Sequence, residues 1–342
     1  MKEIKVGLVG AGRMGSFHGT SIARKVHGAT LVAIADPVPG AAERLAAELG
    51  AAKAYTNPEE MFNDPEVDAV VIAAPARSHA KLVIAAAKAG KAVFCEKPMA
   101  VTLEEADAAI AAAEEANVAL QVGFNRRFVS GFKAAHDNIV EGRIGTPQLL
   151  RSLTRDPGLG DPTPIPEWTI FLETLIHDFD ALLYLNPGAK PTEVYAVADA
   201  LVRPDFKDKG LLDTAVVTIK FDNGAIATAE ANFQAVYGYD VRGEVFGSAG
   251  MVTAGSVQQT NMTRYTADGI SMDTCRKDTE LLHDAYVAEL TSFVECVRAG
   301  NKPYATGEDA RNALSIALAC IKSVQTGQAV KMEEVELAKS SR

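Results

Sequence analysis

A short segment in the middle of the chain carries side chains suited to proton transfer. It reads Glu-Thr-Leu-Ile-His-Asp-Phe-Asp, and Glu173, His177 and Asp180 are spaced by four and then three residues. On a helix this spacing brings all three side chains to one face. Oxidation of a secondary alcohol requires a group that accepts the hydroxyl proton, and a histidine beside a carboxylate does this near neutral pH. The alternative is a helix start whose acids complement the helix dipole and whose histidine only packs.

Lys97 is a second candidate for chemistry. It lies in the segment Cys95–Met99 and follows an expected buried strand over residues 92–95. Ligands of open parallel sheets bind outside the carboxyl ends of the strands, so Lys97 is expected where a nicotinamide and a substrate would meet. An ammonium there can hydrogen-bond and polarise a substrate hydroxyl. The alternative is a surface lysine at a strand end, and Pro98 is a candidate for a cis peptide bond.

The N-terminal segment has the pattern of a phosphate-binding turn. The apolar run of residues 4–9 leads directly into Gly-Ala-Gly-Arg-Met-Gly at residues 10–15. Gly10 permits a tight strand-to-helix turn, Gly12 lets the backbone approach a pyrophosphate, and Gly15 lets the next helix pack closely on the strand. The N-terminus of that helix then offers free N–H groups to the phosphates.

Asp36 indicates which dinucleotide this turn would bind. It ends the next apolar run, residues 30–35. A carboxylate at this place accepts hydrogen bonds from a ribose 2′-hydroxyl and repels a 2′-phosphate, which predicts NAD rather than NADP. Arg13 opposes this preference, because a guanidinium beside the turn could bind a 2′-phosphate as well as a diphosphate.

The first third of the chain alternates between expected strands and helices. Strands are expected at residues 4–9, 30–35, 52–55, 67–74, 92–95 and 118–123, and helices at 40–49, 57–63, 79–89 and 103–116, besides the helix that follows the glycine turn. The continuous apolar strands are typical of a sheet covered on both faces. The pattern predicts an α/β domain with a Rossmann doubly wound parallel sheet over residues 1–123.

The rest of the chain, residues 124–342, has a different rhythm. Helices are expected at 130–141, 173–185, 285–298 and 308–326, and strands at 192–200, 215–221, 225–234, 239–246 and 250–253. Asp222-Asn223-Gly224 is a strong hairpin turn. The pattern predicts an α+β domain for substrate binding and oligomerisation, with a large, mostly antiparallel open sheet. Its uncovered face indicates a partner subunit, and a homotetramer is the expectation.

Composition excludes several classes of partner. The net charge is −10, and no run of basic residues is longer than two, which disfavours nucleic acid and anionic membrane surfaces. No apolar stretch reaches the roughly 18 to 20 residues of a membrane span, and no leader is recognisable. The four cysteines contain no CxxC pair, so neither a metal site nor disulfides are expected, and a cytoplasmic location fits best.

Together these motifs resemble the Gfo/Idh/MocA family of oxidoreductases, and within it the inositol 2-dehydrogenases. The resemblance covers essentially the whole chain and rests on GAGRMG at residues 10–15, EKP at 96–98, GFNRRF at 123–128 and ETLIHDFD at 173–180. It implies that Lys97 is catalytic and orients the substrate, that His177 is the acid/base, and that Glu173 is the carboxylate one turn before it.

The resemblance also implies two sets of contacts. The cofactor is expected at Gly10, Gly12, Arg13, Met14, Gly15, Asp36, Ala74, His79, Glu96 and Lys97. The substrate is expected at Lys97, Arg127, Thr154, Asp156, Glu173, His177 and Tyr239, where Thr154 and Asp156 belong to an expected substrate loop at residues 153–157. For His79, a binding role and a helix-capping role are both open.

Three departures from the family pattern bear on the substrate. Glu173 stands where the family usually has Asp, and Thr154 stands where its substrate loop has His. The bulky segment Trp168–Phe171 replaces a Gly-Gly stretch. These changes do not affect the expected fold and reaction, but they leave open which polyol is the substrate.

The expected function is NAD-dependent oxidation of a secondary hydroxyl of a cyclic polyol, with inositol as the leading substrate. A dehydrogenase of glucose-like or anhydro-sugars is the alternative within the same chemistry, because Trp168 and Phe171 could wall a sugar face. A non-enzymatic NAD-binding regulator is the alternative of another class. The presence of both Lys97 and His177 argues against it, since a sensor requires neither.

Overall fold

The computed structural model describes residues 3–337 and divides the chain into two compact units. Unit 1 contains residues 3–125 and 284–312, and unit 2 contains residues 126–283 and 313–337. The sequence predicted one boundary, between residues 123 and 124. The structure differs in that helix α9 (His283–Ala299) returns to unit 1, because its apolar face is part of the core of that unit.

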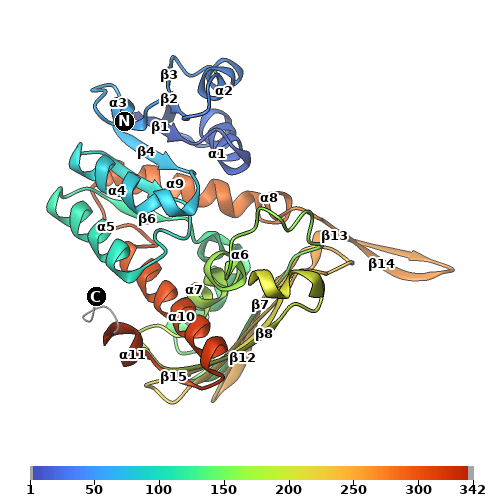
Figure 1. Cartoon of the computed structure of the whole chain (residues 1–342). Coiled ribbons are helices and arrows are strands. Elements are labelled where there is room, and N and C mark those ends of the chain that lie inside the picture. Colours follow the sequence, from blue (N-terminus) through green and yellow to red (C-terminus); the bar gives the residue numbers. More distant parts are fainter. Residues whose placement is uncertain (1–2, 338–342) are drawn as a thin grey trace. The chain divides into compact units, whose positions relative to one another are not determined.

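Unit 1 is built on a six-stranded parallel sheet with the order β3-β2-β1-β4-β5-β6 (Figure 1). Its strands are β1 (Ile4–Val9), β2 (Ala29–Ala35), β3 (Lys53–Tyr55), β4 (Ala69–Ile72), β5 (Ala92–Cys95) and β6 (Leu120–Val122). Its helices include α1 (Arg13–Arg24), α2 (Ala41–Leu49), α3 (Pro58–Phe62), η1 (Ala76–Ser78), α4 (His79–Lys88) and α5 (Leu103–Glu115). The order reverses between β1 and β4, so a ligand crevice is expected outside the carboxyl ends of these two strands.

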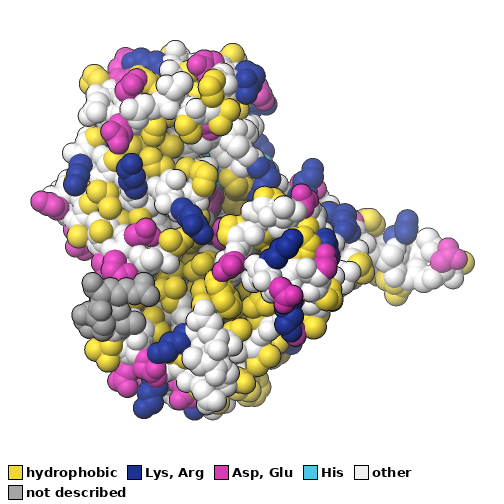
Figure 2. All heavy atoms as spheres, in the orientation of Figure 1, with side chains coloured by type: hydrophobic (Ala, Val, Ile, Leu, Met, Phe, Trp, Pro, Cys, Tyr) yellow, Lys and Arg dark blue, Asp and Glu magenta, His cyan; other side chains and the backbone are white. Residues whose placement is uncertain are grey.

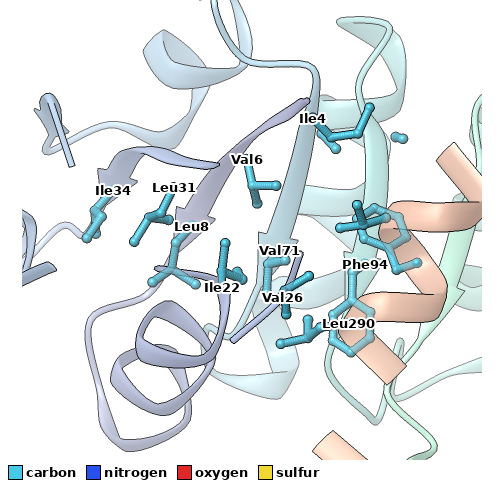
Figure 3. Close-up of a cluster of buried hydrophobic side chains, with 14 of the residues drawn as sticks. Ile4, Val6, Leu8, Ile22, Val26, Leu31, Ile34, Val71, Phe94 and Leu290 are labelled. Atoms are coloured by element: carbon cyan, nitrogen blue, oxygen red, sulfur yellow. The ribbon is translucent and has the colours of Figure 1, made fainter. Parts of the chain in front are cut away.

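The core of unit 1 joins segments that are far apart in the sequence. Leu8 on β1, Ile22 on α1, Phe94 on β5 and Leu290 on α9 belong to one buried cluster (Figure 3). Phe94 also meets Phe293 edge to face, with 5.9 Å between the ring centroids. Burial of each such side chain contributes about 1.5–3 kcal/mol, so α9 is anchored firmly in this core.

Unit 2 contains a seven-stranded mixed sheet with the order β12-β11-β7-β10-β9-β8-β15. Its strands are β7 (Pro147–Arg155), β8 (Pro191–Asp199), β9 (Thr214–Phe221), β10 (Ile226–Asn232), β11 (Asp240–Gly247), β12 (Gly250–Ser256) and β15 (Val330–Lys331). Only the pair formed by β7 and β10 is parallel. The helices are α6 (Ser130–Val140), a π-helical turn η3 (Ile170–Thr174), α7 (Ile176–Tyr184), η4 (Pro204–Lys209), α8 (Asp278–Leu281) and α11 (Met332–Leu337), while η2 (Asn125–Phe128) and α10 (Gly307–Thr326) run from one unit into the other.

One face of this sheet is open and partly apolar. Burial alternates along β9 and β11, as expected for strands with one covered face. The register places Met251, Phe246, Leu149 and Ile226 side by side across four neighbouring strands. Each of these side chains is 43–55% exposed. A row of this kind is typical of a surface that a protein partner covers.

Several elements of unit 2 were absent from the sequence prediction, namely the short η4, α8, β15 and α11 and two larger elements. Strand β7 was not expected, and part of it was interpreted as a loop, because Arg151 and Arg155 interrupt the apolar pattern of this central strand. The hairpin of β13 (Gln258–Thr266) and β14 (Gly269–Thr274) was also not expected, and it extends away from the seven-stranded sheet (Figure 1). Most of its side chains are solvent-exposed, so its sequence carries little hydrophobic alternation.

The surface carries charges of both signs. On the face drawn in Figure 2, basic and acidic side chains are interspersed rather than gathered by sign. Over residues 3–337, none of the helices combines the length and the apolar character that crossing a bilayer requires.

Candidate functional site

The glycine turn of unit 1 has the geometry of a phosphate cradle. Gly10 has a φ of +100°, and a Cβ there would lie 2.4 Å from the carbonyl oxygen of Ala73. A Cβ on Gly15 would lie 1.9 Å from the Gly10 oxygen, so α1 approaches the turn as closely as only glycine allows. At Gly12, the N-cap of α1, a Cβ would meet nothing within 4 Å, and this open space before the helix N-terminus fits a pyrophosphate.

Asp36 lies beside this cradle. Its Oδ2 accepts a hydrogen bond of 2.7 Å from the Ala11 N–H, and its Oδ1 accepts one of 2.8 Å from the Val38 N–H. Each carboxylate oxygen has a second lone pair, so Asp36 can still accept from a ribose hydroxyl. Arg13 is exposed at the first position of α1, and Met14 next to it is half-buried. The residues present therefore fit NAD.

Lys97 is half-buried in a turn whose neighbouring residues are buried, and the Lys97–Pro98 peptide is cis. The Lys97 N–H donates to Glu96 Oε2 at 3.1 Å, and Glu96 Oε1 is 2.6 Å from His18 Nε2. Burial by itself would raise the pKa of Glu96. The hydrogen bond and charge of His18, with the charge of Lys97, outweigh burial and hold that pKa below its usual value.

His79 ties this turn to the end of β4. Its Nδ1 is 2.8 Å from the Pro98 carbonyl oxygen, and its Nε2 is 2.7 Å from that of Ala74. His79 is 2% exposed, and it reaches the two backbone segments at which the sequence predicts cofactor contacts.

Glu173 and His177 lie in unit 2. The sequence had predicted that both belong to one regular helix, and this prediction was wrong. Glu173 belongs to the wide turn η3, and His177 lies in the first turn of α7. The turn follows Trp168, which has a φ of +62°. Glu173 and His177 are both half-buried, whereas Asp178 is fully buried. Glu173 and His177 are therefore partly accessible polar groups of this segment.

Thr154 belongs to a buried ionic network instead of a loop. Asp178 accepts hydrogen bonds from Arg126 Nη1 at 2.6 Å, Ser152 Oγ at 2.5 Å and Thr154 Oγ1 at 2.7 Å. Arg126 also donates to Thr154. All four side chains are almost completely buried, so strand β7, helix α7 and the start of unit 2 are locked together at this point.

Arg127 makes a second buried ion pair. Its Nε and Nη2 donate to the two carboxylate oxygens of Asp180 at 2.9 and 2.6 Å, which is a forked arrangement. The guanidinium also lies 5.2 Å from the ring centroid of Tyr184. Asp180, which the sequence placed on one face with His177, is thus held by an arginine.

Tyr239 and Asp156, both predicted to face the substrate, are brought together. The Tyr239 hydroxyl hydrogen-bonds to Asp156. Burial, followed by the charge of Asp156, raises the pKa of Tyr239 well above its usual value, so this phenol is neutral and donates. Asp156 directly follows β7, and its N–H donates to the Asn232 carbonyl oxygen at the end of β10.

Sequence reasoning missed several buried polar groups. Asp178 and Ser152 were given no role, although both belong to the network around Arg126. The acid Glu289 was read as part of an ordinary helix, but it is fully buried in unit 1. A signal for Glu289 was available, because it falls within the apolar spacing of its helix, between Tyr286 and Phe293.

Comparison with known proteins bears on what these groups do. The model of the oxidoreductase family, NAD-binding Rossmann fold, matches residues 4–124, and the model of its C-terminal alpha/beta domain matches residues 131–332. The chain is 38% identical to a myo-inositol 2-dehydrogenase of Thermotoga maritima, over 97% of this chain and 99% of that protein. It is 37% identical to a scyllo-inositol 2-dehydrogenase (NAD(+)) of Bacillus subtilis, over 97% of each.

The fold is also similar to that of a solved inositol dehydrogenase structure. The scyllo-inositol dehydrogenase of Lactobacillus casei, with bound cofactor NAD(H) and scyllo-inositol, superposes with a TM-score of 0.92 at 29% identity, over 97% of this chain and 100% of that one. Both halves of the sequence are therefore accounted for by one family. The chain belongs to the Gfo/Idh/MocA family of oxidoreductases, and it contains the NAD-binding Rossmann domain of that family followed by its C-terminal α/β domain.

Proposed function

We propose that this protein is an NAD-dependent dehydrogenase that oxidises a secondary hydroxyl of a cyclic polyol, with inositol as the leading substrate. The observation that carries the proposal is the cradle of Gly10, Gly12 and Gly15 with Asp36 beside it, in a chain whose relatives are named for the oxidation of myo- and scyllo-inositol. A carboxylate at this position favours a free 2′-hydroxyl on the cofactor ribose.

The cofactor would be held by residues of unit 1. The glycine turn with Met14 would take the pyrophosphate, and Asp36 would take the ribose. Ala74, Glu96 and Lys97 would border the nicotinamide, with His79 acting through the backbone that it holds. When bound, NAD⁺ supplies a hydride acceptor. The exposed guanidinium of Arg13 would add positive charge near the diphosphate.

The substrate hydroxyl would be activated by Lys97 and His177. The Lys97 ammonium would donate a hydrogen bond to the oxygen and stabilise the negative charge that develops there. The imidazole of His177 would accept the hydroxyl proton while the hydride leaves the ring carbon. Glu173 would orient His177 or bind a neighbouring hydroxyl.

Other polar groups of unit 2 would recognise the remaining hydroxyls. Asp156 and Tyr239 form a hydrogen-bonded pair whose remaining lone pairs can accept hydrogen bonds from substrate hydroxyls. Arg127 and Thr154 would contribute as residues of fixed position, since each is held in a buried ion-pair network. A cyclic polyol suits such a site, because its ring presents several hydroxyls at fixed angles.

A sugar dehydrogenase is the second candidate. The ring of the half-buried Trp168 stacks with that of Phe171 at a centroid distance of 6.4 Å, which could form a flat apolar wall. Phe171 itself is fully buried, so only Trp168 would meet a pyranose face. A panel of inositols and hexoses, assayed for NADH formation, separates the candidates. Turnover of inositols supports the first proposal and turnover of hexoses alone supports the second. NADH binding without turnover of either class would indicate a regulator.

We also propose that copies of this chain assemble through the open face of the seven-stranded sheet, as a homotetramer. The row of Met251, Phe246, Leu149 and Ile226 supports this proposal, because in a monomer these four apolar side chains would be exposed to water. A cytoplasmic location is proposed as well. The four cysteines are buried and free, as suits a reducing compartment.

A further inference from the structure

A cluster of three ionisable side chains is buried next to the Lys97 turn, and the proposed function gives two of them, His18 and Glu289, no role. His18 comes from α1, Glu96 from the end of β5, and Glu289 from α9. Their side-chain nitrogen and carboxylate oxygen atoms lie within 4.8 Å of one another. His18 and Glu289 are completely buried, and Glu96 is 6% exposed.

Glu289 is the unusual member of this cluster. It lies on the apolar face of α9, where Tyr286, Leu290 and Phe293 are also buried. Within the described part of the chain, neither of its carboxyl oxygens has a hydrogen-bond partner. An ionised carboxylate in such a place would be very costly, because it would lose its hydration without gaining a donor.

Glu96, unlike Glu289, has a hydrogen-bond partner for each carboxylate oxygen. Oε1 is 2.6 Å from His18 Nε2, and Oε2 accepts a hydrogen bond of 3.1 Å from the Lys97 N–H. A second carboxylate this close would repel it strongly in a buried site. Burial, followed by the charge of Glu96, raises the pKa of Glu289 well above its usual value, whereas the pKa of Glu96 is lowered. When the environments of two carboxyl groups shift their pKa values in opposite directions, one group is charged and the other is neutral.

A metal ion would be the other way to hold these three groups together, but the distances disfavour it. Two ligands that are each about 2.0–2.2 Å from a tetrahedral zinc ion lie roughly 3.3–3.5 Å apart. The His18 nitrogen and the Glu96 oxygen are only 2.6 Å apart, which is a hydrogen-bond distance. A proton, not a metal ion, therefore connects them.

We propose that Glu289 is a neutral carboxylic acid in the folded protein, and that it is a positioning residue, which keeps Glu96 as the single carboxylate that holds the Lys97 turn. The ionisable groups of the described chain that face Glu289 are His18 and Glu96. Lys97 and His79 also act on Glu96, and each lowers its pKa. The positioning role rests on the function proposed above, whereas the protonation state does not.

The protonation state is tested by the pH dependence of stability, with no need for activity. A carboxyl that stays protonated in the folded state but ionises when unfolded makes the protein less stable as the pH rises above about 4.3. Glu289→Gln keeps the shape and removes that proton. Relative to wild type, the folded-to-unfolded ratio of Glu289→Gln should therefore rise with pH, by up to about tenfold per pH unit.

Glu295→Gln, an exposed change on the same helix, is the matched control and should show no such trend. A flat difference between Glu289→Gln and wild type would overturn the proposal, since Glu289 would then be ionised in the folded protein. Should Glu289→Gln not fold, ¹³C spectra of glutamate-labelled wild type provide the same test. A carboxyl carbon that remains in the neutral-acid position at about pH 7 is expected, and its absence would count against the proposal.

The positioning role has its own test. As the pH rises and Glu289 ionises, the second charge should loosen the hold of Glu96 on the Lys97 turn, so kcat should fall at alkaline pH. Glu289→Gln cannot ionise at this position, so this decline should be absent from that variant, while the dissociation constant of NADH stays unchanged. A decline at the same pH in both proteins would refute the positioning role. A protein with no dehydrogenase activity would instead refute the proposed function and leave the stability test valid.

Discussion

The carboxylate of Asp36 accepts a hydrogen bond of 2.7 Å from the backbone N–H of Ala11. The acid at the end of β2 is therefore fastened to the glycine turn that follows β1. This bond fixes the position of Asp36, which would bind the cofactor ribose, relative to the glycine turn, which would bind the diphosphate. A change at Asp36 should affect cofactor choice more than the fold of either strand.

Cofactor preference is the first prediction. The purified protein should use NAD better than NADP by at least about tenfold, on the order of 1.4 kcal/mol, because a 2′-phosphate would face Asp36. Asp36→Ser should narrow this ratio of kcat/KM values. Arg13→Ala should not narrow it, because Arg13 is the group that would favour a 2′-phosphate. Equal turnover of the two cofactors by wild type would contradict the assignment of Asp36.

The second prediction concerns Lys97. If its ammonium acts on the substrate oxygen in the transition state, Lys97→Ala should lower kcat by roughly 10² or more. The dissociation constant of NADH, measured by fluorescence titration, should stay nearly unchanged. Lys88→Ala, an exposed lysine at the end of α4, serves as the control and should leave both quantities alone. A parallel loss of NADH binding and activity would place Lys97 in the cofactor site instead.

Assembly through the open sheet face is the third prediction. Phe246 is 47% exposed and is flanked in register by Leu149 and Met251. Phe246→Asp places a charge in the middle of this row and should reduce the oligomer to smaller species, as measured by light scattering. Val140→Asp alters a side chain that is 60% exposed on α6 and is not part of this row, and should leave the mass unchanged. A wild-type monomer would exclude the proposal outright.

The fourth prediction addresses stability in unit 2. Asp178 is fully buried and accepts from Arg126, Ser152 and Thr154. Asp178→Asn leaves the buried Arg126 guanidinium without its counter-charge, and should lower the free energy of unfolding by about 3–5 kcal/mol. The measurement is urea denaturation. Asp137→Asn removes the partner of Lys133 at the surface and should change the midpoint little.

The local motifs were predictable from the sequence because their physics is local. The glycine turn depends on steric limits at Gly10 and Gly15, which act within a few residues or on the adjoining strand. The cis Lys97–Pro98 bond was a candidate because proline permits that isomer. The parallel order of unit 1 likewise follows from alternating strands and helices.

Features that depend on distant segments were not predictable in the same way. Strand β7 was missed because Arg151 and Arg155 interrupt its apolar pattern, and their partner Glu230 lies on β10. The wide turn η3 has no sequence signal that we recognise, and it altered the expected relation of Glu173 to His177. The apolar spacing of α9 places Glu289 on the buried face of that helix, but the return of α9 to unit 1, next to Glu96, has no local signal.

The last prediction concerns His177 and Glu173. If His177 accepts the hydroxyl proton, kcat/KM for alcohol oxidation should rise with pH through one ionisation and level off once the imidazole is neutral. His177→Ala should remove that rise and most of the activity, with an unchanged thermal melt.

Glu173→Asp then distinguishes the two roles of Glu173, with the exposed Glu167→Asp as control. If Glu173 stabilises the imidazolium form of His177, the shorter side chain should move the pH at which kcat/KM rises. If Glu173 instead binds a substrate hydroxyl, KM and the ranking of polyols should change while that pH stays in place. Glu173 lies in the wide turn η3 and His177 in α7, so the two residues do not have the spacing of one regular helix. No change in either measurement would leave His177 as the sole acid/base group of this segment.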